Sequence, residues 1–242
     1  MELPPGTREW FNRVRGEFAQ WFAPLCGKPI TYLEIGCWVG GSAEWACQNL
    51  LTHPDARGFG IDPYLEMTRR HPQWQMDLVK EFAAKRVEQY RWTWLYGTSK
   101  DRLPEWNHGT IHALYIDGDH SAAAIVDDFK TALPHLAPDA IVVFDDYGVG
   151  LRKAEPTTPT ACDAIMSVCG SFVRKIGSGK QFAMRLTGSP PERLEWPGEL
   201  PAWNPAQNRR ERIPGGLLTS EQRLAGRIQR RERWAREAAK AV

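Results

Sequence analysis

The chain has 242 residues, of which 42% are hydrophobic and 25% are charged. This length and composition fit one large domain with an appendage and exclude a largely disordered chain. No apolar run approaches the ~18 residues that cross a bilayer, and residues 1–7 lack the basic and apolar segments of a signal peptide. We therefore expect a cytoplasmic protein with no membrane partner.

The cysteine pattern argues against a disulfide framework. The number of cysteines is odd, at five, and they are widely spaced. The sequence has no Cys-x-x-Cys pair, which would indicate a zinc knuckle. We expect free and mostly buried thiols at Cys26, Cys37, Cys47, Cys162 and Cys169.

The net charge of +2 is unevenly distributed along the chain. Residues 188–242 carry a net charge of +4, and the preceding residues carry −2. A basic tail can indicate nucleic-acid binding. Here basic and acidic residues alternate, which favours a helix that docks on the acidic body or on a second subunit. We therefore expect no nucleic-acid partner, and the tail has two open alternatives: docking on the acidic body, or contact with a second subunit in a homo-oligomer.

Short apolar runs alternate with helical patterns along the chain. An aromatic amphipathic helix is predicted over residues 7–22, and further helices over 42–51, 75–90 and 121–133, with Ser42 capping the first of these three. Pro134 and Pro138 are expected to break the chain before the next strand. The predicted strands span residues 30–35, 58–61, 92–96, 111–116, 141–144, 171–176 and 181–186.

The order of these elements predicts an α/β fold. Strands that alternate with helices are joined by crossovers, so the sheet is mainly parallel, with helices on both faces. Only residues 177–180 separate the last two strands, which is hairpin length, so the last strand is reversed. We expect a helical cap over residues 1–29, a core domain over 30–187, and a Pro/Gly linker with a basic closing helix over 188–242.

A glycine-rich turn follows the first predicted strand. Gly36, Gly40 and Gly41 precede a helix, as in nucleotide sites, but the spacing is neither GxGxxG nor a P-loop. Glu34 would repel a pyrophosphate and suits the amino and sulfonium groups of S-adenosylmethionine. After the second strand, Asp62 can accept hydrogen bonds from ribose hydroxyls.

Acidic residues also follow the fourth and fifth predicted strands, which place Asp117, Asp119, His120, Asp145 and Asp146 at one edge of the sheet. Four close carboxylates repel one another, so a cation is expected among them, and Mg²⁺ prefers such oxygen ligands. Any one of these aspartates could be a solvated residue at a strand end or a helix cap. That explanation is much weaker for all four aspartates together.

These motifs occur in the order Glu-Ile-Gly-x-x-x-Gly-Gly-Ser, Ile-Asp-Pro, Gly-Thr-Ser, Ile-Asp-Gly-Asp-His-Ser and Phe-Asp-Asp-Tyr. Over residues 32–186 the chain resembles class I S-adenosylmethionine-dependent methyltransferases. Within them it is similar to the metal-dependent sugar O-methyltransferases of the macrocin, mycinamicin and novobiocin type. The resemblance implies a Rossmann-like, seven-stranded sheet. It also implies metal-dependent methyl transfer to a hydroxyl of a small molecule or sugar.

The resemblance also implies roles for individual residues. His120 is the preferred general base because imidazole titrates near neutral pH, and Asp119 is the alternative. The run 122–124 is all alanine where relatives often carry a tyrosine and an acid, which could change acceptor contacts. The implied cofactor-binding residues are Glu34, Gly36, Gly40 and Ser42 at the methionine end, Asp62 at the ribose, Ser99 near the adenine, and Asp117. The implied metal ligands are Asp117, Asp145 and Asp146.

Three other functions are alternatives to this interpretation. A non-catalytic S-adenosylmethionine- or nucleotide-binding partner subunit would not need the carboxylate cluster. An NAD-dependent oxidoreductase is disfavoured by the absence of GxGxxG and by the reversed hairpin. A nucleic-acid methyltransferase is suggested only by the basic tail, and no Asn-Pro-Pro-aromatic element is present.

Overall fold

The computed structural model describes residues 2–65, 71–151, 157–189 and 194–196. The chain divides into two compact units, Met1–Trp203 and Asn204–Val242, and the described residues all lie in the first. Most of the predicted linker and the whole closing helix over 219–242 therefore lie outside the described residues. No helix in the described ranges is long and apolar enough to span a membrane.

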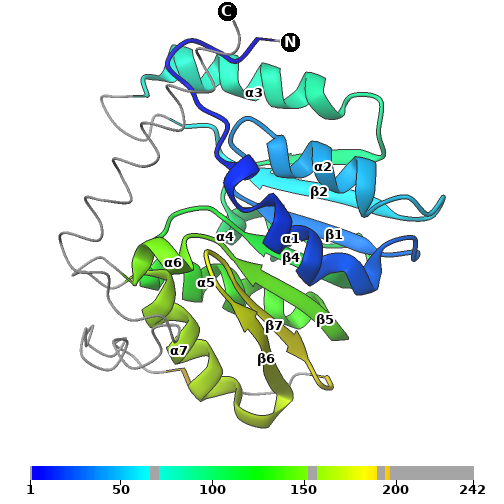
Figure 1. Cartoon of the computed structure of the whole chain (residues 1–242), viewed down its shortest axis with the longest axis vertical. Helices are drawn as coiled ribbons and strands as arrows, with labels where there is room; N and C mark the ends of the chain where they lie inside the picture. Colours follow the sequence, from blue (N-terminus) through cyan, green and yellow to red (C-terminus); the bar gives the residue numbers. More distant parts are fainter. Residues whose placement is uncertain (1, 66–70, 152–156, 190–193, 197–242) are drawn as a thin grey trace, which may run out of the picture. The chain divides into compact units, whose positions relative to one another are not determined.

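The core is one seven-stranded sheet with the order β3-β2-β1-β4-β5-β7-β6 (Figure 1). β7 pairs antiparallel with both β5 and β6, and the other neighbouring pairs are parallel. The predicted fold class, including the reversed last strand, is confirmed. The strands are β1 Thr31–Ile35, β2 Arg57–Asp62, β3 Trp92–Tyr96, β4 Ile111–Ile116, β5 Leu136–Phe144, β6 Val173–Ser178 and β7 Phe182–Leu186.

Helices cover both faces of the sheet, as the strand–helix alternation predicts (Figure 1). The α-helices are α1 Arg15–Phe22, α2 Gly41–Asn49, α3 Gln73–Val87, α4 Ser99–Arg102, α5 Ala122–Ala132, α6 Tyr147–Gly150 and α7 Thr158–Cys169. Short 3₁₀ turns lie at Phe11–Arg13, Ala23–Leu25, Leu133–His135 and Gly170–Phe172.

Two apolar clusters hold these layers together. Phe18 and Phe22 of α1 pack with Leu50 against the Tyr32 and Tyr115 side chains of one sheet face. The other face buries apolar side chains of β1, β2 and β4 against α5 and α7, including Leu33, Phe59, Leu114, Phe129 and Ile165. Because the central strands are covered on both sides, their sequences are almost continuously apolar rather than alternating.

The helix predicted over residues 7–22 is shorter in the structure. The Thr7 backbone and hydroxyl both bond to the Pro4 carbonyl, so the segment turns before the Phe11–Arg13 3₁₀ turn and α1 begin. Most of its aromatic side chains pack in the core, but Trp10 is exposed.

The prediction that Ser42 caps α2 was wrong. Gly40 occupies the N-cap position with φ +73°, a left-handed conformation that glycine adopts without strain. The Ser42 hydroxyl instead donates to Glu34. The serine therefore serves the end of β1 rather than the start of its own helix.

The fifth strand begins earlier than predicted. β5 starts at Leu136, and Pro138 lies inside it instead of breaking the chain before it. The register with β4 shifts between Ile111 and Ala113, and Pro138 and Asp139 are exposed in that interval. A proline is tolerated at such an irregularity because no ladder hydrogen bond is required of it.

All five cysteines are free thiols, as predicted. Cys26 is exposed, whereas the other four are buried.

Candidate active site

The glycine turn brings β1 into close contact with the turn after β4. Gly36 has φ +86°, and a Cβ atom there would lie 2.4 Å from the backbone oxygen of Asp117. No side chain fits in this space, so the glycine is required by both conformation and packing. The residue identities in this turn therefore set how closely the two strand ends approach.

Glu34 is the penultimate residue of β1 and is fully buried. Its carboxylate accepts hydrogen bonds from the Tyr32 hydroxyl, at 2.7 Å, and from the Ser42 hydroxyl. Burial raises the pKa of Glu34 to about 8, although the two hydrogen bonds oppose this shift. Glu34 thus links the end of β1 to the first turn of α2, and its contact with a cofactor stays a prediction.

Asp62, at the end of β2, holds the glycine turn in place. Its Oδ2 accepts hydrogen bonds from the backbone N–H groups of Cys37 and Trp38, at 2.8 and 3.1 Å. Its Oδ1 accepts from the N–H of Tyr64 at 2.8 Å. Burial raises the pKa of Asp62, and these three bonds counteract the shift. Asp62, which is predicted to bind the ribose, therefore also stabilises the glycine turn.

Ser99 begins α4 and is buried beside an acid that sequence analysis missed. Its hydroxyl donates to Asp128 of α5, whose side chain is also buried. Burial raises the pKa of Asp128 to about 6. Ser99 is thus tied to the helix that follows β4, and an adenine contact remains a prediction.

The structure brings together four of the residues predicted to follow β4 and β5. His120 lies between two carboxylates: its Nε2 is 3.1 Å from Oδ1 of Asp117, and its Nδ1 is 3.1 Å from Oδ2 of Asp146. Burial lowers the pKa of His120, but the hydrogen bonds and charges of the two aspartates together raise it to about 10. The imidazolium is therefore the cation that offsets carboxylate repulsion in this structure.

These side chains remain within reach of solvent. His120 is 33% exposed, Asp117 30% and Asp146 33%. A ligand at this edge of the sheet could therefore contact them directly. Asp146 adopts φ +55°, an uncommon backbone conformation for a residue other than glycine.

Asp145 belongs to the same cluster but has different partners. Its Oδ1 accepts a hydrogen bond from Gln181 Nε2 at 3.0 Å. Burial, followed by the charge of Asp117, raises the pKa of Asp145. Tyr115 donates to Asp117 Oδ2 at 3.3 Å and accepts from Gln181. We define Asp117, His120, Asp145 and Asp146 as the carboxylate cluster.

Asp119 does not join this cluster by any hydrogen bond in the described structure. Its Oδ1 accepts from the N–H of Ser121, two residues along the same turn. Across the described ranges, no three His, Cys, Asp or Glu side chains are arranged to hold a metal ion.

Sequence analysis missed Tyr115 and Gln181, both buried at this edge of the sheet. Each is a polar residue in or beside an otherwise apolar strand, at the end nearest the acidic motifs. That signal was present in the sequence, but the pairing of β7 with β5 is what brings Gln181 to Asp145.

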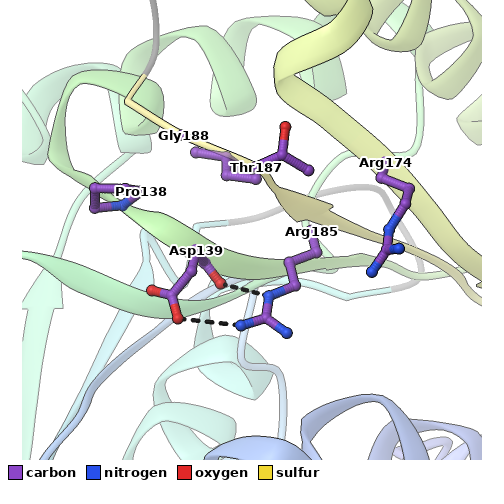
Figure 2. A pocket seen from close by; sticks show the side chains of 7 residues that line it. Pro138, Asp139, Arg174, Arg185, Thr187 and Gly188 are labelled. Carbon is purple, nitrogen blue, oxygen red and sulfur yellow. Dashed lines mark hydrogen bonds and ion pairs between the residues drawn. The ribbon is translucent and has the colours of Figure 1, made fainter.

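A separate pocket of about 340 Å³ lies at the opposite ends of the strands (Figure 2). Arg174 and Arg185 face each other across β6 and β7, and Arg185 pairs with Asp139 at 3.1 Å. Figure 2 shows both guanidinium groups on the same face of the sheet as Asp139. This pocket contains none of the predicted catalytic or cofactor-binding residues.

Known proteins resemble this chain in sequence and in fold. The model of a family described as a methyltransferase domain matches residues 33–147. An uncharacterized protein of Acanthamoeba polyphaga mimivirus is 29% identical over 122 residues, which cover 49% of this chain and 52% of that protein. The chain thus spans about half the length of this curated relative.

Two solved structures share the fold at low identity. An O-methyltransferase from Bacillus cereus, in complex with S-adenosylhomocysteine, has a TM-score of 0.54 and 17% identity over 76% of this chain and 84% of its own. The MycE methyltransferase of mycinamycin biosynthesis, with Mg and S-adenosylhomocysteine, has a TM-score of 0.53 and 16% identity over 81% of this chain and 54% of its own.

The family match and the fold agree with each other. A little under half of the chain, residues 33–147, matches the model of the methyltransferase-domain family. The described chain has a Rossmann-like methyltransferase fold, with the reversed last strand that the sequence predicts.

Proposed function

We propose that the protein transfers a methyl group from S-adenosylmethionine to a hydroxyl oxygen of a small molecule or sugar. The observation that carries this proposal is the carboxylate cluster beside the glycine turn, at the carboxyl ends of β1, β4 and β5. Ligands of open α/β sheets bind at this edge. A general base and acidic side chains next to a methyl donor suit activation of a hydroxyl.

The cofactor would lie over the glycine turn. S-adenosylmethionine supplies the methyl group when it is bound. Asp62 holds the backbone of Cys37 and Trp38 in the turn, and its Oδ1 receives only one hydrogen bond from the described protein. A carboxylate oxygen accepts more than one hydrogen bond, so Asp62 can brace the turn and still accept from a ribose hydroxyl.

A divalent cation, Mg²⁺, is the second expected group. Asp117, Asp145 and Asp146 would hold it, and their oxygens are ligands of the chemical type that Mg²⁺ prefers. Bound there, it would lower the pKa of an acceptor hydroxyl, as metal ions do for bound water. Asp117 and Asp146 both contact His120 in this structure, so binding of a cation by these residues would require the imidazole to move aside.

His120 is the proposed base, with a condition that the geometry sets. While both ring nitrogens contact carboxylates and the pKa is about 10, the imidazole is protonated and cannot accept a proton. Opening either contact lowers its pKa toward the ordinary value and frees a nitrogen. Asp119 lies on the same turn and is the alternative base.

A methyl-transfer screen tests the function. Purified protein is incubated with S-adenosylmethionine and polyhydroxylated acceptors, with Mg²⁺ or with excess chelator, and the products are analysed by mass spectrometry. We expect a mass gain of one methylene unit that depends on Mg²⁺. Binding of S-adenosylhomocysteine without transfer to any acceptor would favour a non-catalytic partner subunit. Full activity in excess chelator would contradict the assignment of Asp117, Asp145 and Asp146 as metal ligands.

A further inference from the structure

Gln181 is a fully buried polar side chain to which the proposed chemistry assigns no role. It precedes β7 at the end of the hairpin turn, and 0% of its surface is exposed. Its Nε2 donates to Asp145 Oδ1 at 3.0 Å and to the Tyr115 hydroxyl at 3.2 Å. An amide nitrogen has two hydrogens, so both are used within or next to the carboxylate cluster.

The hydrogen bond to Tyr115 extends the influence of Gln181 to a second carboxylate. Because the Tyr115 oxygen accepts from Gln181, its own hydrogen is directed to Asp117 Oδ2, 3.3 Å away. Asp117 follows β4, and Asp145 follows the neighbouring β5. One amide group therefore orients the acids of two adjacent strands, one directly and one through a tyrosine.

The other end of this amide shows that the arrangement has a cost. Gln181 Oε1 has no hydrogen-bond partner among the described residues. A buried polar atom without a partner destabilises the fold, because it loses its hydrogen bonds to water and gains none in return. An apolar side chain of similar size would avoid that cost but would leave Asp145 without its donor. Glutamine at this position therefore provides two hydrogen bonds at the cost of one unpaired buried oxygen.

The backbone of Gln181 is held from the N-terminal side of the molecule. Glu17 of α1 accepts hydrogen bonds at its Oε2 from the N–H groups of Lys180 and Gln181, at 2.9 and 3.1 Å. The Lys180 carbonyl in turn accepts from the N–H of Gly148, at 3.0 Å, just beyond Asp146. The hairpin turn is therefore fixed to both α1 and the segment after β5.

We propose that Gln181 is a positioning residue, which orients Asp145 directly and Asp117 through Tyr115 for the transfer reaction. Glu17 holds the turn from which Gln181 extends. The proposal rests on the proposed function for the role of the two carboxylates, and it concerns side chains that contact neither cofactor nor acceptor themselves.

The test replaces Gln181 with methionine, which has similar size and no donor. In a crystal structure of the Gln181→Met variant with S-adenosylhomocysteine, we expect Asp145 and the Tyr115 hydroxyl to leave their present positions. The Kd for S-adenosylhomocysteine should stay within about twofold, because the glycine turn is untouched. With an acceptor found in the screen, kcat should fall by about tenfold or more, a loss of ~1.4 kcal/mol of transition-state stabilisation, with KM less affected.

A matched control uses the other buried glutamine described in the structure. Gln75 of α3 is 5% exposed and donates its amide to the Pro5 carbonyl, away from the carboxylate cluster. Gln75→Met removes a comparable buried amide, so it should leave kcat and the positions of Asp145 and Asp117 unchanged. A loss of kcat equal to that of Gln181→Met would show a general effect of stability and overturn the proposal.

A second pair of variants acts where folding is less at risk. Glu17→Ala removes the backbone anchor and should shift Gln181 and Asp145, whereas Glu17→Gln keeps a carbonyl acceptor and should restore most of their order. If Asp145 and Asp117 hold their positions in Gln181→Met and in Glu17→Ala, the proposal is overturned. If the wild type transfers no methyl group, the proposed function fails, while these side-chain positions still decide the role of Gln181.

Discussion

The Nδ1 atom of His120 lies 3.1 Å from Oδ2 of Asp146. The proposed base, which follows β4, therefore contacts a residue that follows the neighbouring strand β5. The same ring contacts Asp117 through its other nitrogen. Both acids therefore control whether the imidazole can accept a proton.

His120→Ala should lower kcat by roughly 10²-fold or more if His120 is the general base, and it should leave S-adenosylhomocysteine binding intact. Removal of the ring also frees Asp117 and Asp146, so divalent-ion affinity should not fall. Rapid-quench kinetics and calorimetry measure the two quantities. Asp119→Asn is the matched comparison, and a larger loss there would move the base to Asp119.

Asp62→Ala should weaken S-adenosylhomocysteine binding by about tenfold or more. The substitution removes an acceptor for three backbone N–H groups of the two turns, and hydrogen bonds to a charged group contribute about 1.5–3 kcal/mol each. Isothermal titration calorimetry gives the Kd. Asp55→Ala is the control, since the Asp55 side chain is 78% exposed and lies outside the site. An unchanged Kd for Asp62→Ala, or tight binding of NAD instead, would contradict the cofactor assignment.

The Ser99–Asp128 pair should make stability depend on pH. The pKa of Asp128 is near 3.8 when exposed and about 6 in the fold, so the folded state retains a proton that the unfolded state loses. Stability therefore falls as pH rises from about 4 to about 6, and the loss persists above pH 6.

Asp128→Asn removes this titration and keeps an oxygen that can accept from Ser99. The free energy of unfolding of the variant minus that of the wild type should be about 1–2 kcal/mol larger at pH 7.5 than at pH 5. Urea denaturation at both pH values measures the difference. Asp127→Asn is the neighbouring control, because the Asp127 side chain is 38% exposed and pairs with Lys100 at the surface. A constant difference between the two pH values would mean that Asp128 titrates normally.

Removal of residues 204–242 should leave the Kd for S-adenosylhomocysteine within about twofold, because every proposed site residue lies in the first unit. The cut is placed after Trp203 because Trp196 packs on Phe129 of α5, with ring centroids 6.1 Å apart. If the tail forms a subunit contact, light scattering should show a smaller oligomer after truncation. Loss of salt-sensitive binding to DNA or RNA would instead identify a nucleic-acid arm.

The sheet could be predicted from the sequence because its signals are local. The strands β3 and β4 match their predicted bounds, and the four-residue spacing before β7 predicts the reversal. Helix α7 was not predicted, since several of its buried residues are small or polar, such as Ala161, Cys162 and Thr160, and do not stand out in the sequence as an apolar face. β5 was placed too late because Pro138 is usually a strand breaker.

The site could be predicted only in part, because spacing shows which strand ends meet but not which atoms pair. Asp117, His120, Asp145 and Asp146 do meet at one edge. The sequence could not show that His120 would occupy the space between two acids. Nor could it show that Glu17 and Gln181, 164 residues apart, would be joined by a hydrogen bond. Such contacts depend on the long-range packing of α1 and the hairpin.

Trp38, Tyr64 and Asp146 all adopt positive φ, and they follow β1, β2 and β5 at the active-site edge. Residues other than glycine hold this conformation at an energetic cost, so glycine at any of the three would relax the backbone. A redesign that selects for thermal tolerance alone would therefore favour glycine at Asp146, whereas Tyr64 is 2% exposed and the cavity left by its removal would outweigh the relieved strain. Glycine at Asp146 would remove a carboxylate from the rim where chemistry is expected, so stability-guided engineering of this scaffold must leave that residue unchanged.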